Sequence, residues 1–120
     1  MSDIIIWHNP KCSKSREALG FIQDEGYNSK IVKYLEDSIS KDEIRAVLKM
    51  LGIGARELMR TKEDIYKELN LANEQDEEML IHSMVQHPIL IERPIIIKDG
   101  SAIIGRPSDK IVPFLKKIVI

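Results

Sequence analysis

Residues 4–35 read IIIWHNPKCSKSREALGFIQDEGYNSKIVKYL, and their pattern predicts two strands joined by a helix. The apolar run within residues 3–8 is typical of a buried strand. Residues 13–25 have apolar side chains at helical spacing, and Gly26 is a stop signal for that helix. Residues 30–35 predict a second strand. Because strand, helix and strand follow one another within about thirty residues, we expect a βαβ unit whose two strands are parallel.

Two more apolar runs lie near the end of the chain, at residues 94–97 and 101–104. The three residues between them, KDG, contain the Asp-Gly pair that favours a tight hairpin, so these strands should be antiparallel. A final helix capped by Ser108 would have Pro113 at its fifth position, where proline removes a helical hydrogen bond. We therefore expect this helix either to begin nearer Lys110 or to kink.

Helices are expected in the middle of the chain, over approximately residues 40–87. Ser40 and Glu43 have the spacing of a capping box, and Gly52 ends the helix that follows them. The pattern also predicts two shorter helices, one capped by Thr61 and running through about Leu69, the other capped by Asp76 and running through about Gln86.

The predicted order of elements is therefore βαβ, a helical block, then ββα. Packing the two halves together makes a four-stranded mixed sheet with helices on it, which is an α/β fold of the thioredoxin-like plan. The helical block of roughly fifty residues is inserted between the halves. The length of 120 residues suggests a single domain, residues 1–120, with this insert inside it.

The composition is that of an ordinary soluble protein, with 43% hydrophobic and 31% charged residues. The formal net charge of −1 gives no reason to expect nucleic acid or an anionic membrane as a partner. One cysteine leaves no internal disulfide and fits a reducing compartment. No apolar run reaches the roughly 18 residues of a membrane span, and the first residues are too short and acidic for a signal peptide. We expect a cytoplasmic protein.

Cys12 is that cysteine, and it lies between the first predicted strand and the first predicted helix. The free N–H groups and the dipole at a helix start favour an anion, so the thiol should ionise more readily than a free cysteine. Lys11, Lys14 and Arg16 add positive charge nearby. A lone cysteine is often an inert core residue. The polar neighbours of Cys12 favour the reactive interpretation instead.

Four blocks of the sequence resemble the ArsC-like arsenate reductases that are coupled to glutathione and glutaredoxin. The blocks are HNPKCSKSR (residues 8–16), LMRTK (58–62), HPILIERPI (87–95) and IGRPS (104–108). They occur in the same order as in that family, and the likeness covers nearly the whole chain. The resemblance implies a thioredoxin-like fold and the reduction of arsenate to arsenite.

The resemblance also implies site residues, with Cys12 as the nucleophile and Arg60, Arg93 and Arg106 as the groups that bind the oxyanion. Guanidinium groups suit this role because each pairs with two oxyanion oxygens and offsets the repulsion between thiolate and arsenate. Taken singly, each arginine is also compatible with a surface charge or a structural ion pair, and Arg60 depends mainly on the resemblance. The family further implies a cis peptide bond before Pro94, facing the cysteine.

His8 and Ser15 are candidate supporting residues. His8 lies four residues before Cys12 and either supports the thiolate, as a cation or hydrogen-bond donor, or is a polar residue at a strand end. Ser15 stands where a dithiol protein would have the second cysteine of Cys-x-x-Cys, so the second thiol must come from elsewhere. The resemblance implies glutathione as co-substrate and glutaredoxin as partner, without a bound cofactor. The histidines match no zinc pattern, and we expect no metal.

Three other classes of function are compatible with parts of the sequence. Low-molecular-weight phosphatases need Cys-x5-Arg, whereas here the sixth residue after Cys12 is Ala18. Spx-type transcription regulators, which bind RNA polymerase, resemble the same fold, but many carry the Cys-x-x-Cys that this chain lacks. A third alternative is an ArsC-like reductase of another thiol-linked substrate, because the same arginines could hold phosphate or a glutathione carboxylate.

Overall fold

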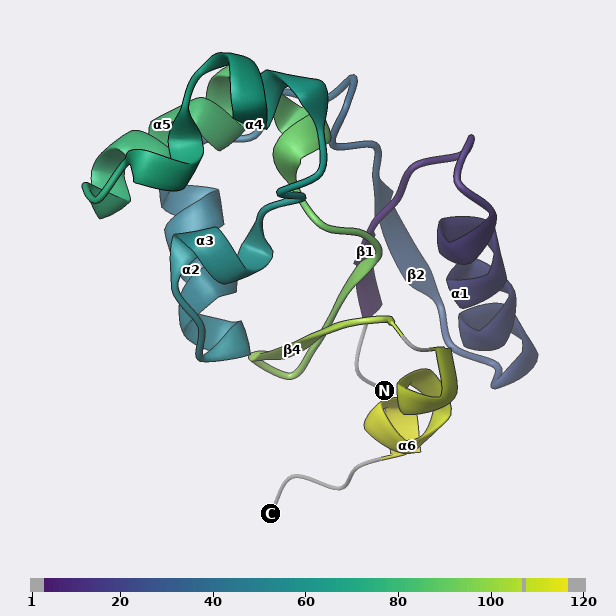
Figure 1. Cartoon of the computed structure of the whole chain (residues 1–120). Coiled ribbons are helices and arrows are strands. Elements are labelled where there is room, and N and C mark those ends of the chain that lie inside the picture. The colour runs from purple at the N-terminus through teal and green to yellow at the C-terminus, as the bar shows by residue number, and fades with distance from the viewer. Residues whose placement is uncertain (1–3, 107, 117–120) are drawn as a thin grey trace. The chain divides into compact units, whose positions relative to one another are not determined.

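The computed structural model describes residues 4–106 and 108–116, and the strands in these residues form one four-stranded mixed sheet (Figure 1). The strands are β1 (Ile4–Trp7), β2 (Ser29–Val32), β3 (Ile95–Lys98) and β4 (Ser101–Ile104). Their order across the sheet is β2-β1-β3-β4, with β1 parallel to β2 and antiparallel to β3, and β3 antiparallel to β4. The predicted fold class, a thioredoxin-like α/β sheet, is confirmed.

Two helices, α1 (Ser13–Asp24) and α6 (Ile111–Lys116), pack on one face of this sheet (Figure 1). The core between them consists of side chains that are fully buried, namely Ile4, Ile6, Ala18, Ile22, Ile96, Ile111 and Leu115. Alternate residues of β1 contribute to this core because successive side chains of a strand point to opposite faces. Burying each isoleucine contributes roughly 1.5–3 kcal/mol, so both β1 and α1 are anchored and the loop between them is held at both ends.

The hairpin and the last helix agree with the sequence predictions. Asp99 and Gly100 have φ values of 52° and 77°, the positive values that a two-residue type I′ turn requires. A 3-10 turn, η3 (Ser108–Lys110), comes before α6. Pro113 is therefore the third helical residue of α6. An N–H in the first turn has no acceptor within the helix, so proline removes no hydrogen bond there.

The structure divides into two compact units, Met1–Asp37 with Arg93–Ile120, and Ser38–Glu92. The second unit contains the helices α2 (Lys41–Leu51), α3 (Ala55–Leu58), α4 (Asp64–Glu68) and α5 (Glu77–Gln86) and the 3-10 turns η1 (Leu71–Asn73) and η2 (Pro88–Leu90). It thus holds the predicted helical insert. No helix in the described part of the chain is long and apolar enough to cross a bilayer. The single-domain interpretation stays a prediction.

Two of the predicted helix caps are confirmed. The Glu43 N–H donates to Ser40 Oγ at 3.1 Å and the Ser40 N–H donates to Glu43 Oε1 at 3.2 Å, which is the complete capping box at the start of α2. Asp76 Oδ1 accepts the Glu78 N–H at 3.0 Å and caps α5. Gly52 ends α2 with a left-handed φ of 70°.

The predicted cap at Thr61 is wrong. The Glu63 N–H donates to the Arg60 carbonyl at 3.2 Å, so the chain makes a turn through Thr61 and only then enters α4 at Asp64. The N-cap residue is Glu63, whose side chain forms no capping hydrogen bond. The helix is consequently shorter than the sequence suggested.

The predicted strand over residues 30–35 is too long at its end. The observed strand β2 stops at Val32, because the N–H groups of Glu36 and Asp37 both donate to the Lys33 carbonyl, at 2.9 and 2.7 Å. The Asp37 carboxylate in turn accepts the Lys33 N–H at 3.1 Å. These bonds turn the chain away from the sheet. The first residue of the strand predicted over 3–8 lies outside the described residues.

Candidate active site

The carboxyl end of β1, the start of β3 and the end of β4 meet at one edge of the sheet. The register aligns the last residue of β1 with the first of β3, and that residue with the last of β4. The residues just beyond these positions are His8, Pro94 and Gly105. The Gly105 N–H donates to the Pro94 carbonyl at 2.8 Å, which continues the β3–β4 pairing by one residue. Segments that are far apart in sequence thus bring their candidate residues to the same edge.

The loop from β1 to α1 is organised by Asn9. Its N–H donates to Ser15 Oγ, its carbonyl accepts the Cys12 N–H and its side-chain oxygen accepts the Lys11 N–H, each at 3.0 Å. These bonds place Cys12 at the start of α1. This role of Asn9 was not predicted from the sequence. An Asn followed by Pro-Lys is a known turn signal, because its side chain bonds the backbone two residues on, and could have identified it.

Cys12 is the N-cap residue of α1, with extended backbone angles and a partly exposed side chain. In this conformation its sulfur forms no capping hydrogen bond, but it lies at the end of the helix where the N–H groups point outward. Burial by itself raises the pKa of the Cys12 thiol. The Ser15 and Lys14 N–H groups and the Arg93 guanidinium, all of which favour the thiolate, outweigh burial, so the pKa lies below its ordinary value.

His8 and Ser15 form a buried pair behind this loop. His8 is 5% exposed and Ser15 is fully buried, and His8 Nδ1 lies 2.7 Å from Ser15 Oγ. Burial lowers the pKa of His8, and the nearby charges of Lys33 and Arg16 lower it further, while the contact with Ser15 raises it. At neutral pH the imidazole is therefore uncharged. The lowered pKa disfavours the cationic role considered for His8, and its hydrogen-bond contact is with Ser15, so a hydrogen bond from His8 to the thiolate stays a prediction.

Arg93 and Arg106 flank the paired ends of β3 and β4. The Arg93–Pro94 peptide bond is cis, as predicted. The Arg106 N–H donates to the Ile104 carbonyl at 2.8 Å, so the chain turns sharply at Gly105. Arg93 and Arg106 are the residues just outside the last paired positions, Pro94 and Gly105, and the Nε atoms of both are shielded from solvent. Pro107, the other proline of this block, lies outside the described residues.

Arg60 lies in the second unit and has local partners. Its backbone N–H donates to the Leu90 carbonyl at 2.7 Å. Its guanidinium forms an ion pair with Glu63 at 2.7 Å and lies 3.5 Å from the Ile89 carbonyl. The structural ion pair that the sequence left open for Arg60 is thus present. A convergence of Arg60 with Cys12 stays a prediction.

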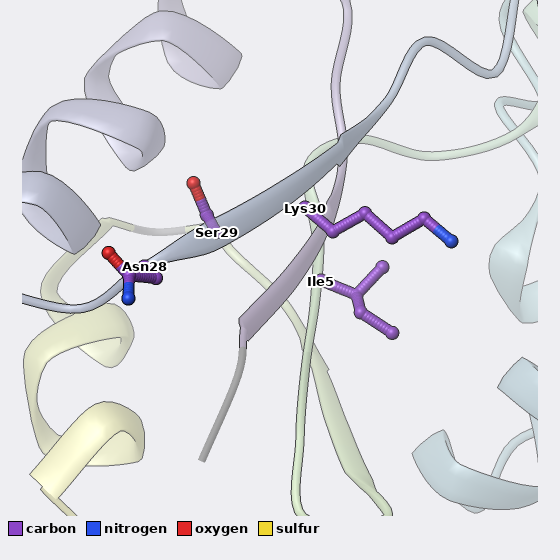
Figure 2. Close-up of a pocket in the computed structure, with 4 residues that line it drawn as sticks. All are labelled: Ile5, Asn28, Ser29 and Lys30. Carbon is purple, nitrogen blue, oxygen red and sulfur yellow. The ribbon is translucent and has the colours of Figure 1, made fainter. Parts of the chain in front are cut away.

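The described residues contain no metal-binding cluster, and a hollow in the first unit lies away from Cys12. Residues 4–106 and 108–116 contain no group of three or more His, Cys, Asp or Glu side chains that could hold a metal ion. A hollow in the first unit is lined by Ile5, Asn28, Ser29 and Lys30 (Figure 2). It lies toward the amino end of β2, whereas Cys12 follows the carboxyl end of the parallel strand β1. None of the predicted site residues lines it.

Comparisons with known proteins point to one family and one fold. The model of the ArsC family matches residues 7–114. An arsenate reductase from Neisseria meningitidis serogroup A is 42% identical over 113 residues, covering 92% of this chain and 97% of that protein. An uncharacterized Escherichia coli K12 protein is 50% identical over 109 residues, covering 89% and 92%. The structure of an arsenate reductase from Vibrio cholerae superposes with a TM-score of 0.90 at 43% identity, covering 93% and 97% of the two chains.

Proposed function

The chain belongs to the ArsC family, and from this premise we propose that it reduces arsenate to arsenite through the thiolate of Cys12. One observation supports the proposal most directly. One sheet edge carries all three residues: Cys12 comes after the end of β1, Arg93 before the start of β3 and Arg106 after the end of β4. Arg93 is close enough to Cys12 to lower the pKa of its thiol. Relatives of similar length that are named arsenate reductases support the same substrate.

The guanidinium groups at this sheet edge would offset the electrostatic repulsion between the thiolate and arsenate. A thiolate that attacks arsenate brings two anions together, and two unit charges about 4 Å apart repel by roughly 4 kcal/mol at an effective dielectric constant of about 20. Arg93 and Arg106 would bind the arsenate oxygens in pairs, and the N–H groups at the start of α1 would add further donors. Arg60 is the third arginine that the family resemblance implies, and its role in binding the oxyanion stays a prediction.

His8 and Ser15 act on the position of the nucleophile rather than on the arsenate. The neutral His8 imidazole holds Ser15, and Ser15 accepts the Asn9 N–H from the loop that carries Cys12. If His8 carries its proton on Nε2, the Ser15 hydroxyl donates to His8 Nδ1 while its oxygen accepts the Asn9 N–H. The loop is then rigid before the substrate arrives, which is the condition for an oriented attack.

The redox balance requires a second thiol. Cys12 replaces one oxygen of arsenate, which leaves as water, and the product is a sulfur–arsenic(V) adduct. Reduction to arsenite then needs two electrons, and these come from joining two sulfurs in a disulfide. The chain has one cysteine. We therefore propose that glutathione, acting as co-substrate, attacks the adduct and that glutaredoxin resolves the mixed disulfide, in a reducing cytoplasm. No bound cofactor is needed.

The proposal is tested by measuring arsenite production from arsenate in the presence of glutathione and glutaredoxin. Cys12→Ser should abolish it, and Ser13→Ala, a change at the exposed neighbouring residue, should leave it unchanged. Arg93→Lys and Arg106→Lys keep the charge but lose the paired hydrogen bonds, and each should lower kcat/KM roughly 10- to 100-fold. Arsenite production by the Cys12→Ser variant would refute the mechanism.

A second candidate function uses the same residues, because a guanidinium group that suits an arsenate also suits a carboxylate. In this alternative the same thiolate and arginines act on another thiol-linked substrate, such as a glutathione disulfide bound through its carboxylates. The same assay separates the two. Rapid alkylation of Cys12 together with no arsenate turnover would favour the second candidate.

A further inference from the structure

Gly105 lies at the sheet edge that carries the candidate site, in close contact with Pro94 and Ile111. It is buried, it follows the last residue of β4, and its N–H donates to the Pro94 carbonyl at 2.8 Å. The chain then turns so sharply that the next N–H, that of Arg106, returns to the Ile104 carbonyl at 2.8 Å. Gly105 is thus the last paired residue before Arg106, and its partner Pro94 is the residue directly after Arg93.

A side chain cannot be added at this position without moving its neighbours. A Cβ atom on Gly105 would lie 2.9 Å from Pro94 Cγ and 3.3 Å from Ile111 Cδ1. Ile111 is fully buried in the core, so it has no open space to move into. Pro94 Cγ belongs to a closed ring, so it retreats only when the backbone at Pro94 retreats with it.

The two ways of relieving this contact have the same consequence. If the segment at Pro94 moves, it carries Arg93 with it, and if the turn at Gly105 moves, it carries Arg106. Either movement changes the spacing of the two guanidinium groups. Gly20, which lies within α1 of the same unit, has nothing within 4 Å of the same hypothetical atom. The close approach is a property of Gly105 and not of glycines in this unit in general.

From these contacts we infer that Gly105 is a positioning residue of the oxyanion site: the absence of a side chain there sets the separation of Arg93 and Arg106. The inference rests on the proposed function in so far as the oxyanion is arsenate. Gly105 itself contacts no substrate. Its effect passes through the Pro94 ring and the Arg106 turn, and a displacement of about 1 Å at such a position can cost roughly 100-fold in rate.

The test compares Gly105→Ala with Gly20→Ala, using iodoacetamide alkylation of Cys12 as the readout. Sulfate or arsenate bound at the site should slow alkylation of the parent protein. In Gly105→Ala we expect the anion concentration for half-protection to rise at least about 10-fold and the pH midpoint of alkylation to rise, because Arg93 no longer supports the thiolate in place. In Gly20→Ala both values should match the parent protein. A purely structural role would lower the melting temperature without moving the pH midpoint.

A second variant separates positioning from core packing and covers the case in which Gly105→Ala folds poorly. Ile111→Val removes the Cδ1 atom at 3.3 Å but leaves Pro94 Cγ at 2.9 Å, so the double variant Gly105→Ala/Ile111→Val should fold and still be poorly protected. Recovery of the parent protection in the double variant would overturn the inference. So would equal protection in Gly105→Ala and the parent protein. If arsenate fails to protect even the parent protein, the proposed function fails instead, and the pH midpoint still decides the role of Gly105.

Discussion

Replacing Ser15 with alanine should destabilise the loop that carries Cys12, because Ser15 joins two groups that have little access to water. The change removes the acceptor of the Asn9 N–H at 3.0 Å and the partner of His8 Nδ1 at 2.7 Å. Ser15 is fully buried and His8 is 5% exposed, so neither site opens readily to solvent. A lost hydrogen bond costs about 1 kcal/mol, and a buried group left unsatisfied costs about 1–3 kcal/mol.

For the two contacts together we expect a loss of about 2–3 kcal/mol in the free energy of unfolding. In a chain of this length the melting temperature should fall by roughly 8–15 °C. Urea unfolding followed by circular dichroism measures the loss directly. The control is Ser83→Ala, which removes a buried hydroxyl that donates only to the Met79 carbonyl of its own helix, at 2.9 Å. A serine hydroxyl that donates to a carbonyl of its own helix adds little to stability. The free energy of unfolding of the control should therefore stay within about 0.5 kcal/mol of the parent protein.

A loss of less than about 0.5 kcal/mol in Ser15→Ala would refute the reasoning, since the His8–Ser15–Asn9 contacts would then contribute nothing to the order of the loop. A loss of equal size in both serine variants would refute it as well. In that case the effect would come from removing any buried hydroxyl rather than from the position of Ser15.

The remaining predictions concern the charges and caps that the structure places. Arg93→Gln should raise the pH midpoint of Cys12 alkylation, because Arg93 lowers the pKa of that thiol. The control Arg45→Gln, a change at an exposed arginine that pairs with Glu78, should leave the midpoint unchanged. Equal midpoints in the parent protein and both variants would contradict a role of Arg93 in the ionisation of Cys12. The folded-state pKa of His8 lies below its ordinary 6.5, so in mildly acidic solution the unfolded chain binds more protons than the folded one. The contribution of the neutral His8 to the free energy of unfolding is therefore fully present above about pH 6.5 and is lost as the pH falls further. His8→Gln should flatten that decline in urea midpoints, and an unchanged slope would count against it. Ser40→Ala should cost about 1 kcal/mol through loss of the capping box, whereas the exposed Ser38→Ala should cost almost nothing, and similar losses would rule the box out as the cause.

The local elements were predictable where their signals lie within a few residues of one another. The capping box at Ser40 and the Asp-Gly turn of the hairpin appear where the sequence indicated them. The errors also have a local cause. Thr61 has the residue type of a cap but lies inside a turn, and the strand after Lys30 stops early because the Asp37 carboxylate competes for the Lys33 N–H. Side chains of this kind offer the backbone an alternative to regular structure.

The candidate site divides in the same way. Cys12 could be recognised from its position between a strand and a helix, and the Asn9 turn could have been. Gly105 could not, because a glycine that avoids a clash looks the same in sequence as any other glycine. Arg60 carried the signal of an i,i+3 ion pair with Glu63, and the structure shows that pair.

The order of strands and helices and the prediction of a reactive Cys12 came from residues that are neighbours along the chain, since hydrophobic periodicity and helix-terminus electrostatics are short-range properties. The position of Arg93 beside the Cys12 thiol was decided by the pairing of β1 with β3, and the position of Arg106 at the same sheet edge by the pairing of β3 with β4. That register is set by burying Ile4, Ile6 and Ile96 in one core. A slip of one residue in the register of a strand would move all of that strand's core side chains to the opposite face of the sheet. The close contact of Gly105 with Pro94 exists only in that register, because it joins two segments that the linear chain keeps apart.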